Sequence, residues 1–313
     1  MNAKNLNIIE DHVGRRIDNY LINVYKSLPK SKIYSMIRKG EIRVNSGRIK
    51  PTYKLKLDDE IRIPPYLVDF DNEVSDLKIP PSRIKAFNSS IIYQNEDYIV
   101  VNKEHELSVH SGTHNQFGLI DIARAQYPLM EIDLCHRIDK STSGCVLLSK
   151  NKTFLRHFNK QLKSNEVVKK YEAILVGVMK KNTKIESNID TSTKKFQHKV
   201  QEVDEGKKAI STFKVLKKFT SFSHVEITIS TGRMHQIRVQ SANLNHPVVN
   251  DKKYGLFSLN KYISKETTIN RLALHAKSVS FLDLNNQTVY YQATKNNEFD
   301  ILLSQLNNLT VKT

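Results

Sequence analysis

The chain has 313 residues, 39% of them hydrophobic and 8% aromatic, which is enough apolar material for two packed domains. Lys and Arg number 49 against 32 Asp and Glu, giving a net charge of +17, so we expect a polyanionic partner. Apolar runs are too short to cross a bilayer and the first residues lack an apolar leader, which excludes membrane insertion and predicts a cytoplasmic protein. The two cysteines, Cys135 and Cys145, lie among apolar residues, which indicates a reducing compartment.

The first helices of the chain can be placed from an apolar stripe and its boundaries. The stripe consists of Ile17, Leu21 and Val24. It predicts an amphipathic helix that ends near Pro29. We expect a second helix with Ser31 as its N-cap and Gly40 just beyond its end.

Two short strands are expected next, at residues 41–45 and 60–63, with a turn at 46–47. Residues 14–63 contain 13 Lys and Arg against 5 Asp and Glu, a net of +8, so nearly half of the chain's charge lies in fifty residues. Codon bias toward Lys and Asn explains part of the overall charge but not this concentration. We therefore predict an RNA-binding face. Its candidate contacts are Arg15, Arg16, Lys30, Lys32, Arg38, Arg43, Arg48 and Lys50.

Two proline pairs, Pro64-Pro65 and Pro80-Pro81, enclose an acidic stretch without clear periodicity. Paired prolines disfavour helices and central strands, so this stretch is interpreted as an extended linker. The predicted organisation is a basic module over residues 1–65, a linker over 66–85 and a larger domain over 86–313.

The larger domain mixes strands and helices without a βαβ repeat. Strands are predicted at residues 98–102, 144–149, 170–178, 211–217, 224–230, 272–283 and 288–292. Helices are predicted at residues 118–126, 152–163 and 235–244, and near the C-terminus. Because several consecutive strands are joined by short turns, the sequence predicts an α+β fold with a mostly antiparallel central sheet flanked by helices.

The segment CHRIDKSTSGCVLLSK, residues 135–150, combines a polar loop with a buried strand. The loop contains His136, Arg137 and Asp139, and the strand that follows would hold it rigidly, as a positioned nucleophile requires. On this local pattern alone, an Asp that caps a turn or pairs with Lys140 explains the sequence equally well.

HRIDKSTSG resembles the HRLDxxTSG signature of the RluA family of pseudouridine synthases. Further segments resemble family motifs in the same order, which extends the resemblance over nearly the whole larger domain. They are YIVVNKEHELSVH (98–110), KKYEAILVG (169–177), GKKAISTFKVL (206–216), TGRMHQIRVQ (231–240) and LALHA (272–276). The basic module is similar to the S4 RNA-binding domain, and PKSKIYSMIRKGEIRVN with the segment after it is most similar to the RluC branch. The resemblance implies isomerisation of uridine to pseudouridine in the 23S RNA of the large ribosomal subunit.

By the same resemblance, Asp139 is the nucleophile and Arg238 the cation that keeps it ionised. Ile237 is expected to pack under the uracil, and Tyr171 to stack on it and to help to remove a proton. The target atoms are inaccessible in a stacked helix, so the uridine must flip out. Arg137 is expected to fill the gap that the uridine leaves, and His136 is expected beside the substrate. Neither cofactor nor metal is implied, and we expect a monomer.

Other functions remain open at this point. His105, His110 and His114 suggest zinc, but no Cys or carboxylate completes a known spacing. The same chemistry on tRNA, or on other ribosomal uridines, is a second alternative. A third is an S4-type RNA-binding protein without catalytic activity.

Overall fold

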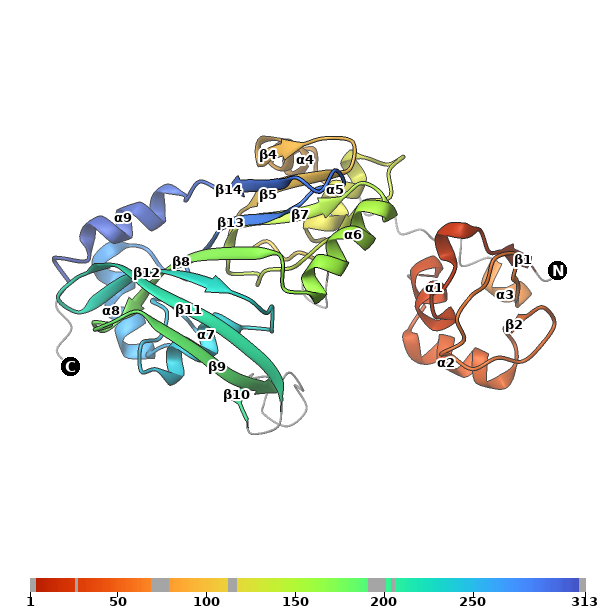
Figure 1. Cartoon of the computed structure of the whole chain (residues 1–313), viewed down its shortest axis with the longest axis horizontal. Helices are drawn as coiled ribbons and strands as arrows, with labels where there is room; N and C mark the ends of the chain where they lie inside the picture. The colour runs from red at the N-terminus through yellow and green to blue at the C-terminus, as the bar shows by residue number, and fades with distance from the viewer. Residues whose placement is uncertain are drawn as a thin grey trace. The chain divides into compact units, whose positions relative to one another are not determined.

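The computed structural model describes residues 4–25, 28–68, 79–111, 117–190, 201–203 and 206–309. The chain forms two compact units, Met1–Lys78 and Ile79–Thr313 (Figure 1). No helix in these described ranges is long and apolar enough to cross a membrane. His114 lies outside the described residues.

The N-terminal unit packs two helices against a small antiparallel sheet. Its elements are β1 (Lys4–Asn7), the 3-10 turn Glu10–His12, α1 (Ile17–Val24), α2 (Lys30–Lys39), β2 (Arg43–Val44), β3 (Glu60–Ile63) and α3 (Pro65–Val68). The strands are ordered β1-β3-β2, and the predicted stripe residues Ile17 and Leu21 are fully buried in the core that they share with the helices.

Two predictions for this region are wrong. Ser31 is not the N-cap of α2, because the helix begins at Lys30 and Pro29 occupies the cap position without a side-chain hydrogen bond. The stretch between the proline pairs is not wholly extended, because α3 begins at Pro65 and α4 (Pro81–Ser89) begins at Pro81. Proline has no N–H to lose at the first turn of a helix and its fixed φ suits that position. Residues 69–78 of the predicted linker lie outside the described residues.

The C-terminal unit is built on one eleven-stranded sheet. Its strands are β4 (Ile91–Gln94), β5 (Tyr98–Lys103), β6 (Asp133–Leu134), β7 (Ser143–Ser149), β8 (Val168–Val176), β9 (Thr183–Asp190), β10 (Gln201–Glu202), β11 (Lys207–Lys218), β12 (Phe222–Ile229), β13 (Leu274–Leu282) and β14 (Thr288–Gln292). The main path runs β10-β9-β11-β12-β8-β13-β7-β5-β4, with β14 paired to β13 and β6 to β7. Every pairing is antiparallel except that of β13 with β7, so the predicted α+β class and mostly antiparallel sheet are confirmed.

The remaining helices lie against this sheet (Figure 1). They are α5 (Leu119–Gln126), α6 (Lys152–Lys163), α7 (Gln236–Asn243), α8 (Phe257–Thr267) and α9 (Asn297–Gln305). Each strand and helix predicted for this unit has a counterpart, whereas β4, β6, β9, β10, α4 and α8 were not predicted.

The loop that carries Asp139 is fixed by the start of β7. All seven residues of β7 are buried, and Gly144 pairs with Ala276 of β13 in the parallel register. Gly144 has φ +115°, and a Cβ there would lie 2.2 Å from the Ala276 carbonyl oxygen. Only glycine allows the two strands to approach this closely.

Gly144→Ala should therefore lower the free energy of unfolding by about 3 kcal/mol or more, because the new methyl meets backbone in a conformation that strains any other residue. Gly232→Ala is the control, since a Cβ there would meet only the end of the Lys169 side chain, at 3.4 Å. It should cost about 1 kcal/mol or less. Urea unfolding of the full chain, followed by circular dichroism, measures both, and equal stabilities would contradict the close approach.

Candidate active site

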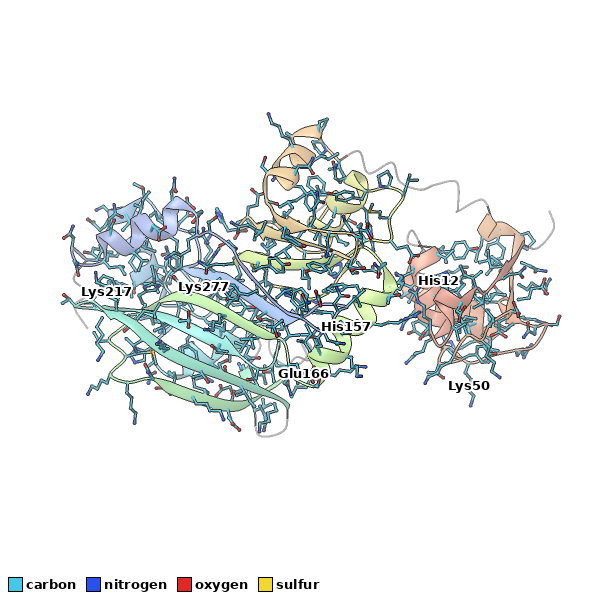
Figure 2. All side chains as sticks on the ribbon, turned by 45° about the horizontal axis from the view of Figure 1, so that its top comes forward. His12, Lys50, His157, Glu166, Lys217 and Lys277 are labelled. Carbon is cyan, nitrogen blue, oxygen red and sulfur yellow. The ribbon has the colours of Figure 1, made fainter. Side chains whose placement is uncertain are left out.

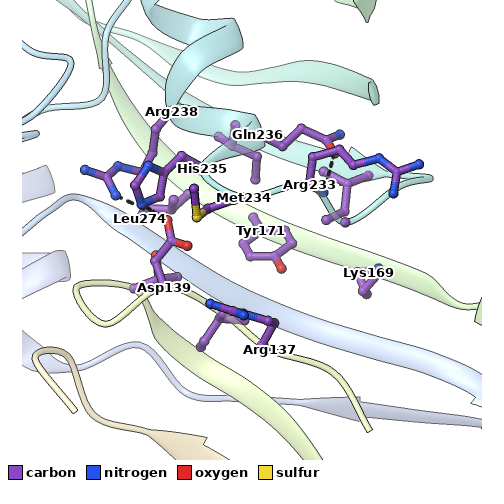
Figure 3. Close-up of a pocket in the computed structure, with 15 residues that line it drawn as sticks. Arg137, Asp139, Lys169, Tyr171, Arg233, Met234, His235, Gln236, Arg238 and Leu274 are labelled. Carbon is purple, nitrogen blue, oxygen red and sulfur yellow. Dashed lines mark hydrogen bonds and ion pairs between the residues drawn. The ribbon is translucent and has the colours of Figure 1, made fainter. Parts of the chain in front are cut away.

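A cavity of about 310 Å³ opens in the C-terminal unit between the loop before β7, strand β8 and the start of α7. Its lining includes Arg137, Asp139, Lys169, Tyr171, Arg233, His235, Ile237 and Arg238. In Figure 3, Asp139 and Arg238 stand at one end of the cavity, Lys169 and Arg233 at the other, and the Tyr171 ring between them. Segments distant in sequence thus meet at one concave site, as a ligand site requires.

Arg238 is shared between two carboxylates. Its Nε and Nη2 donate to the two oxygens of Asp251 at 2.7 and 2.8 Å, a bidentate pair in which Asp251 is fully buried. Its remaining Nη1 donates to Asp139 Oδ2 at 3.3 Å. Burial opposes the charge of the guanidinium, but the hydrogen bonds and charge of Asp251, followed by those of Asp139, raise the pKa of Arg238 above its ordinary value.

Asp251 is the residue that fixes Arg238. Burial alone would raise its pKa, yet the Arg238 guanidinium and the backbone N–H groups of Lys253 and Tyr254 hold the pKa of Asp251 below its usual value. The Tyr254 ring also lies under the guanidinium, 5.2 Å from Cζ to the ring centroid. Arg238 therefore presents one free edge in a set direction, toward Asp139.

His235 lies beside Asp139, and its imidazole is neutral. Its Nδ1 lies 2.8 Å from the Tyr254 hydroxyl and its Nε2 lies 3.9 Å from Asp139 Oδ2. Burial, with Arg238 acting in the same direction against the opposing effect of Asp139, lowers the pKa of His235 to about 4. Near neutral pH this imidazole adds no positive charge beside Asp139.

Tyr171 and Ile237 supply the apolar walls. Both side chains are almost fully buried, and they line the cavity from β8 and α7 respectively. Burial raises the pKa of Tyr171 well above its ordinary value, and the nearby Asp139 charge acts in the same direction. The neutral phenol is therefore the dominant form, a flat surface suited to stacking.

Two groups outside the cavity hold the Asp139 loop in place. The buried Lys103 Nζ donates to the carbonyl oxygens of Leu107, Glu104 and Lys140 at 2.7, 2.8 and 3.0 Å. Three acceptors match the three N–H groups of an ammonium, although burial lowers the pKa of Lys103. His136 accepts a hydrogen bond from the Leu147 N–H at 3.2 Å, and its ring stacks on Phe158.

His136 does not line the cavity, although it was expected beside the substrate. Its ring faces β7 and α6, because alternate residues of a short extended segment point to opposite sides. Burial lowers the pKa of His136 to about 3, so it stays neutral. We interpret it as a support of the loop.

The start of α7 is held by buried glutamines. Gln236 Nε2 donates to the Ile210 carbonyl and to Ser211 Oγ, while Gln240 accepts from the same hydroxyl and donates to Ser187. These bonds fasten α7 to β11 and β9, and so fix Ile237 and Arg238 between them. In the QIRVQ segment, the two glutamines therefore hold the helix in place on either side of Ile237 and Arg238.

In the N-terminal unit, most of the predicted RNA contacts are exposed and Lys50 extends away from it (Figure 2). Arg16 is engaged, since it pairs with the buried Asp18 at 2.6 Å. Arg43 donates to the Gly40 carbonyl at the end of α2. Lys30, Lys32 and Arg38 are exposed on α2, a helix without any acidic residue.

Several site residues were not predicted from the sequence. Asp251, Lys103 and Lys169 carry charges that matter only because the fold buries them, and for Asp251 and Lys169 no local pattern marks that burial. A lysine at the end of a strand that begins as an apolar run, as in YIVVNK, was the available signal for Lys103. Within the described ranges, no three His, Cys, Asp or Glu residues are arranged to hold a metal.

Comparison with known proteins identifies both units. Residues 97–243 match the RNA pseudouridylate synthase family, and residues 15–61 match the S4 domain. The chain is 39% identical over 279 residues to ribosomal large subunit pseudouridine synthase C of Buchnera aphidicola subsp. Baizongia pistaciae, which covers 88% of each chain. It is 35% identical over 308 residues to the Haemophilus influenzae protein of the same name, with 97% of this chain and 95% of that one covered.

Solved structures show the same fold in the larger unit. Human RNA pseudouridylate synthase domain containing 4 superposes with a TM-score of 0.59 at 26% identity, covering 71% of this chain and 95% of that one. Human RNA pseudouridylate synthase domain containing 1 gives a TM-score of 0.57 at 26% identity, with 68% and 86% covered. On the identity with its bacterial relatives and the match of both units, the chain belongs to the RluA family of pseudouridine synthases, which are isomerases, and carries an S4 domain in its N-terminal unit.

Proposed function

We propose that this enzyme converts uridines of large-subunit ribosomal RNA to pseudouridine, with Asp139 as the group that attacks the flipped-out nucleotide. The substrate class rests on the names of relatives that match nearly the whole chain, together with the S4 domain. The role of Asp139 rests on one observation, that the Arg238 pair directs a partly exposed carboxylate into the cavity.

The proposed reaction needs an ionised carboxylate beside the ribose. Asp139 attacks C1′, or removes the C2′ proton on the alternative route, while the N1–C1′ bond breaks and its electron pair leaves with the uracil. After the ring turns, C5 joins C1′ as Asp139 is released or, on the alternative route, as Asp139 returns the C2′ proton. The C5 proton then leaves to solvent and N1 takes up a proton. Arg238 holds Asp139 in place at 3.3 Å, while the charge of Arg238 is also balanced by Asp251.

Tyr171 and Ile237 fit the two faces of a flipped uracil. Proton removal by Tyr171 requires its hydroxyl proton to leave, and its raised pKa opposes this, so stacking is the role that burial favours. Arg137 is exposed at the mouth of the cavity, and no described carboxylate pairs with it. This position suits insertion into the gap left by the uridine.

Asp139→Asn should abolish pseudouridine formation and leave RNA affinity within about threefold, because the change is isosteric and removes only the charge. The test maps pseudouridines in ribosomal RNA from cells with the gene, without it, and with the variant alone. Sites lost on deletion should return with the wild type but not with the variant. Full restoration by the variant would refute the role of Asp139, and sites lost only from tRNA would refute the substrate class.

Arg137→Lys should slow the single-turnover rate roughly tenfold or more while RNA binding falls only slightly. Lysine keeps the charge but loses the planar stacking surface, which is worth roughly 1–3 kcal/mol per base. Lys140→Arg is the control in the same loop, since its exposed pair with Glu106, at 3.9 Å, contributes little. An Arg137→Lys variant within twofold of the wild type would leave Arg137 as an ordinary surface cation.

Replacing Lys30, Lys32 and Arg38 together by Gln should weaken RNA binding and leave the saturated chemical step unchanged. Each lost phosphate contact lowers the dependence of log K on log salt by about 0.7–0.9, so the slope should become shallower by about 2. The matched control replaces the exposed Lys261 and Lys265 of α8 by Gln. RNA-binding titrations at several salt concentrations measure this slope. An unchanged slope would show that α2 does not contact the RNA.

A further inference from the structure

Lys169 is a buried cation that faces the cavity. It precedes Tyr171 by two residues on β8, so both side chains lie on the same face of the sheet. Only 8% of Lys169 is exposed. Its Nζ lies 3.4 Å from the position that a Cβ on Gly232 would occupy, so the opposite wall at this point is bare backbone.

The charge of Lys169 has no counter-ion among the described residues. Neighbouring lysines of the sheet are paired: Lys170, on the other face of β8, lies 3.3 Å from Glu226, and Lys277 lies 2.8 Å from Glu172. Lys169 instead lies near Arg233, and burial together with this like charge lowers its pKa to about 8. An unpaired buried ammonium is unfavourable in the free enzyme. We therefore expect a ligand that binds beside Lys169 to carry negative charge.

The reaction produces such an anion at this place. When N1–C1′ breaks, the electron pair leaves with the ring, and the negative charge spreads over N1, O2 and O4 of the detached uracil. The phenol of Tyr171, the neutral imidazole of His235 and the side chain of Ile237 bring no positive charge to it. In Figure 3, Tyr171 lies between Asp139 and Lys169. A uracil that stacks on Tyr171 with its ribose at Asp139 would therefore have its far edge toward Lys169.

We propose that Lys169 is a further catalytic residue, whose ammonium pairs with the uracil anion as N1–C1′ breaks and holds it while the ring turns. This proposal rests on the proposed function. A single cation on a flexible stem can follow O2 and O4 as they change places, which a rigid fork cannot do equally well. When C5 attacks C1′, the negative charge passes to the departing Asp139 carboxylate, so the ring is neutral and the ion pair ends. The C5 proton then leaves to solvent and N1 takes up a proton, which gives neutral pseudouridine.

The test compares Lys169→Met with the wild type on two RNAs, one with uridine and one with 5-fluorouridine at the target. Fluorine withdraws electron density, so the detached fluorouracil anion needs less stabilisation. Glycosidic cleavage is followed in single turnovers at saturating enzyme, by nucleoside analysis after digestion. The variant should lose about 100-fold on uridine, the usual effect of removing one transition-state charge contact, but only about tenfold on 5-fluorouridine.

Lys170→Met is the matched control, since it removes a lysine from the same strand on the face away from the cavity. It should stay within about threefold of the wild type on both RNAs. Lys169→Arg should recover part of the lost rate, because arginine restores the positive charge but its rigid fork cannot follow O2 and O4 as the ring turns.

Equal losses by Lys169→Met on the two RNAs would overturn the proposal, because a structural defect ignores leaving-group charge. A loss confined to RNA affinity would overturn it in favour of a phosphate contact. A wild type that fails to convert uridine, or an active Asp139→Asn variant, would instead refute the proposed function, and this is seen before the Lys169 variants are compared.

Discussion

The active site depends on one guanidinium that serves two carboxylates. Asp251 is fully buried and takes two of the nitrogens of Arg238, so the third can point only toward Asp139. Removing one partner of such a buried pair leaves an uncompensated charge, typically at a cost of about 3–5 kcal/mol. The longer contact, 3.3 Å, falls on the partly exposed carboxylate. The strong bond therefore fixes Arg238, and the weaker one positions Asp139 at the wall of the cavity.

The surrounding fold limits how far either partner can move. Lys103 ties the Asp139 loop to the end of β5, and Gly144 allows β7 to lie directly against β13. On the other side, Gln236 and Gln240 fasten α7 to β11. Each restraint uses buried polar groups that must stay bonded, so a small displacement costs several hydrogen bonds at once. Rigidity here comes from polar anchors around the site, while the apolar core supports the sheet beneath it.

The sequence predicted the larger unit well because its central strands are continuous apolar runs, as at residues 144–149, and its helices have clear boundaries. Strands such as β9 and β10 were missed, since their polar residues show little alternation and pairing alone makes them strands. The proline pairs were misread because proline both breaks a helix and begins one. Asp139, Tyr171 and Arg238 were proposed from family motifs, and the structure places all three around one cavity. Asp251 was not assigned a role, because only the tertiary fold reveals its pairing.

The cavity combines one partly exposed carboxylate with a surplus of cations, and this imbalance fits the stabilisation of a leaving group by positive charge. His235 and Tyr171 hold their protons in forms that add no positive charge near neutral pH, the imidazole because its pKa is low and the phenol because its pKa is high. A leaving group must then be stabilised by fixed charge. Arg238 is neutralised by its two carboxylates, whereas Lys169 and Arg233 at the other end of the cavity are not paired with any described carboxylate. Charge of opposite sign at the two ends matches the polarity of the bond that breaks in the proposed reaction. In that reaction the ribose lies at the anionic end of the cavity and the uracil at the cationic end.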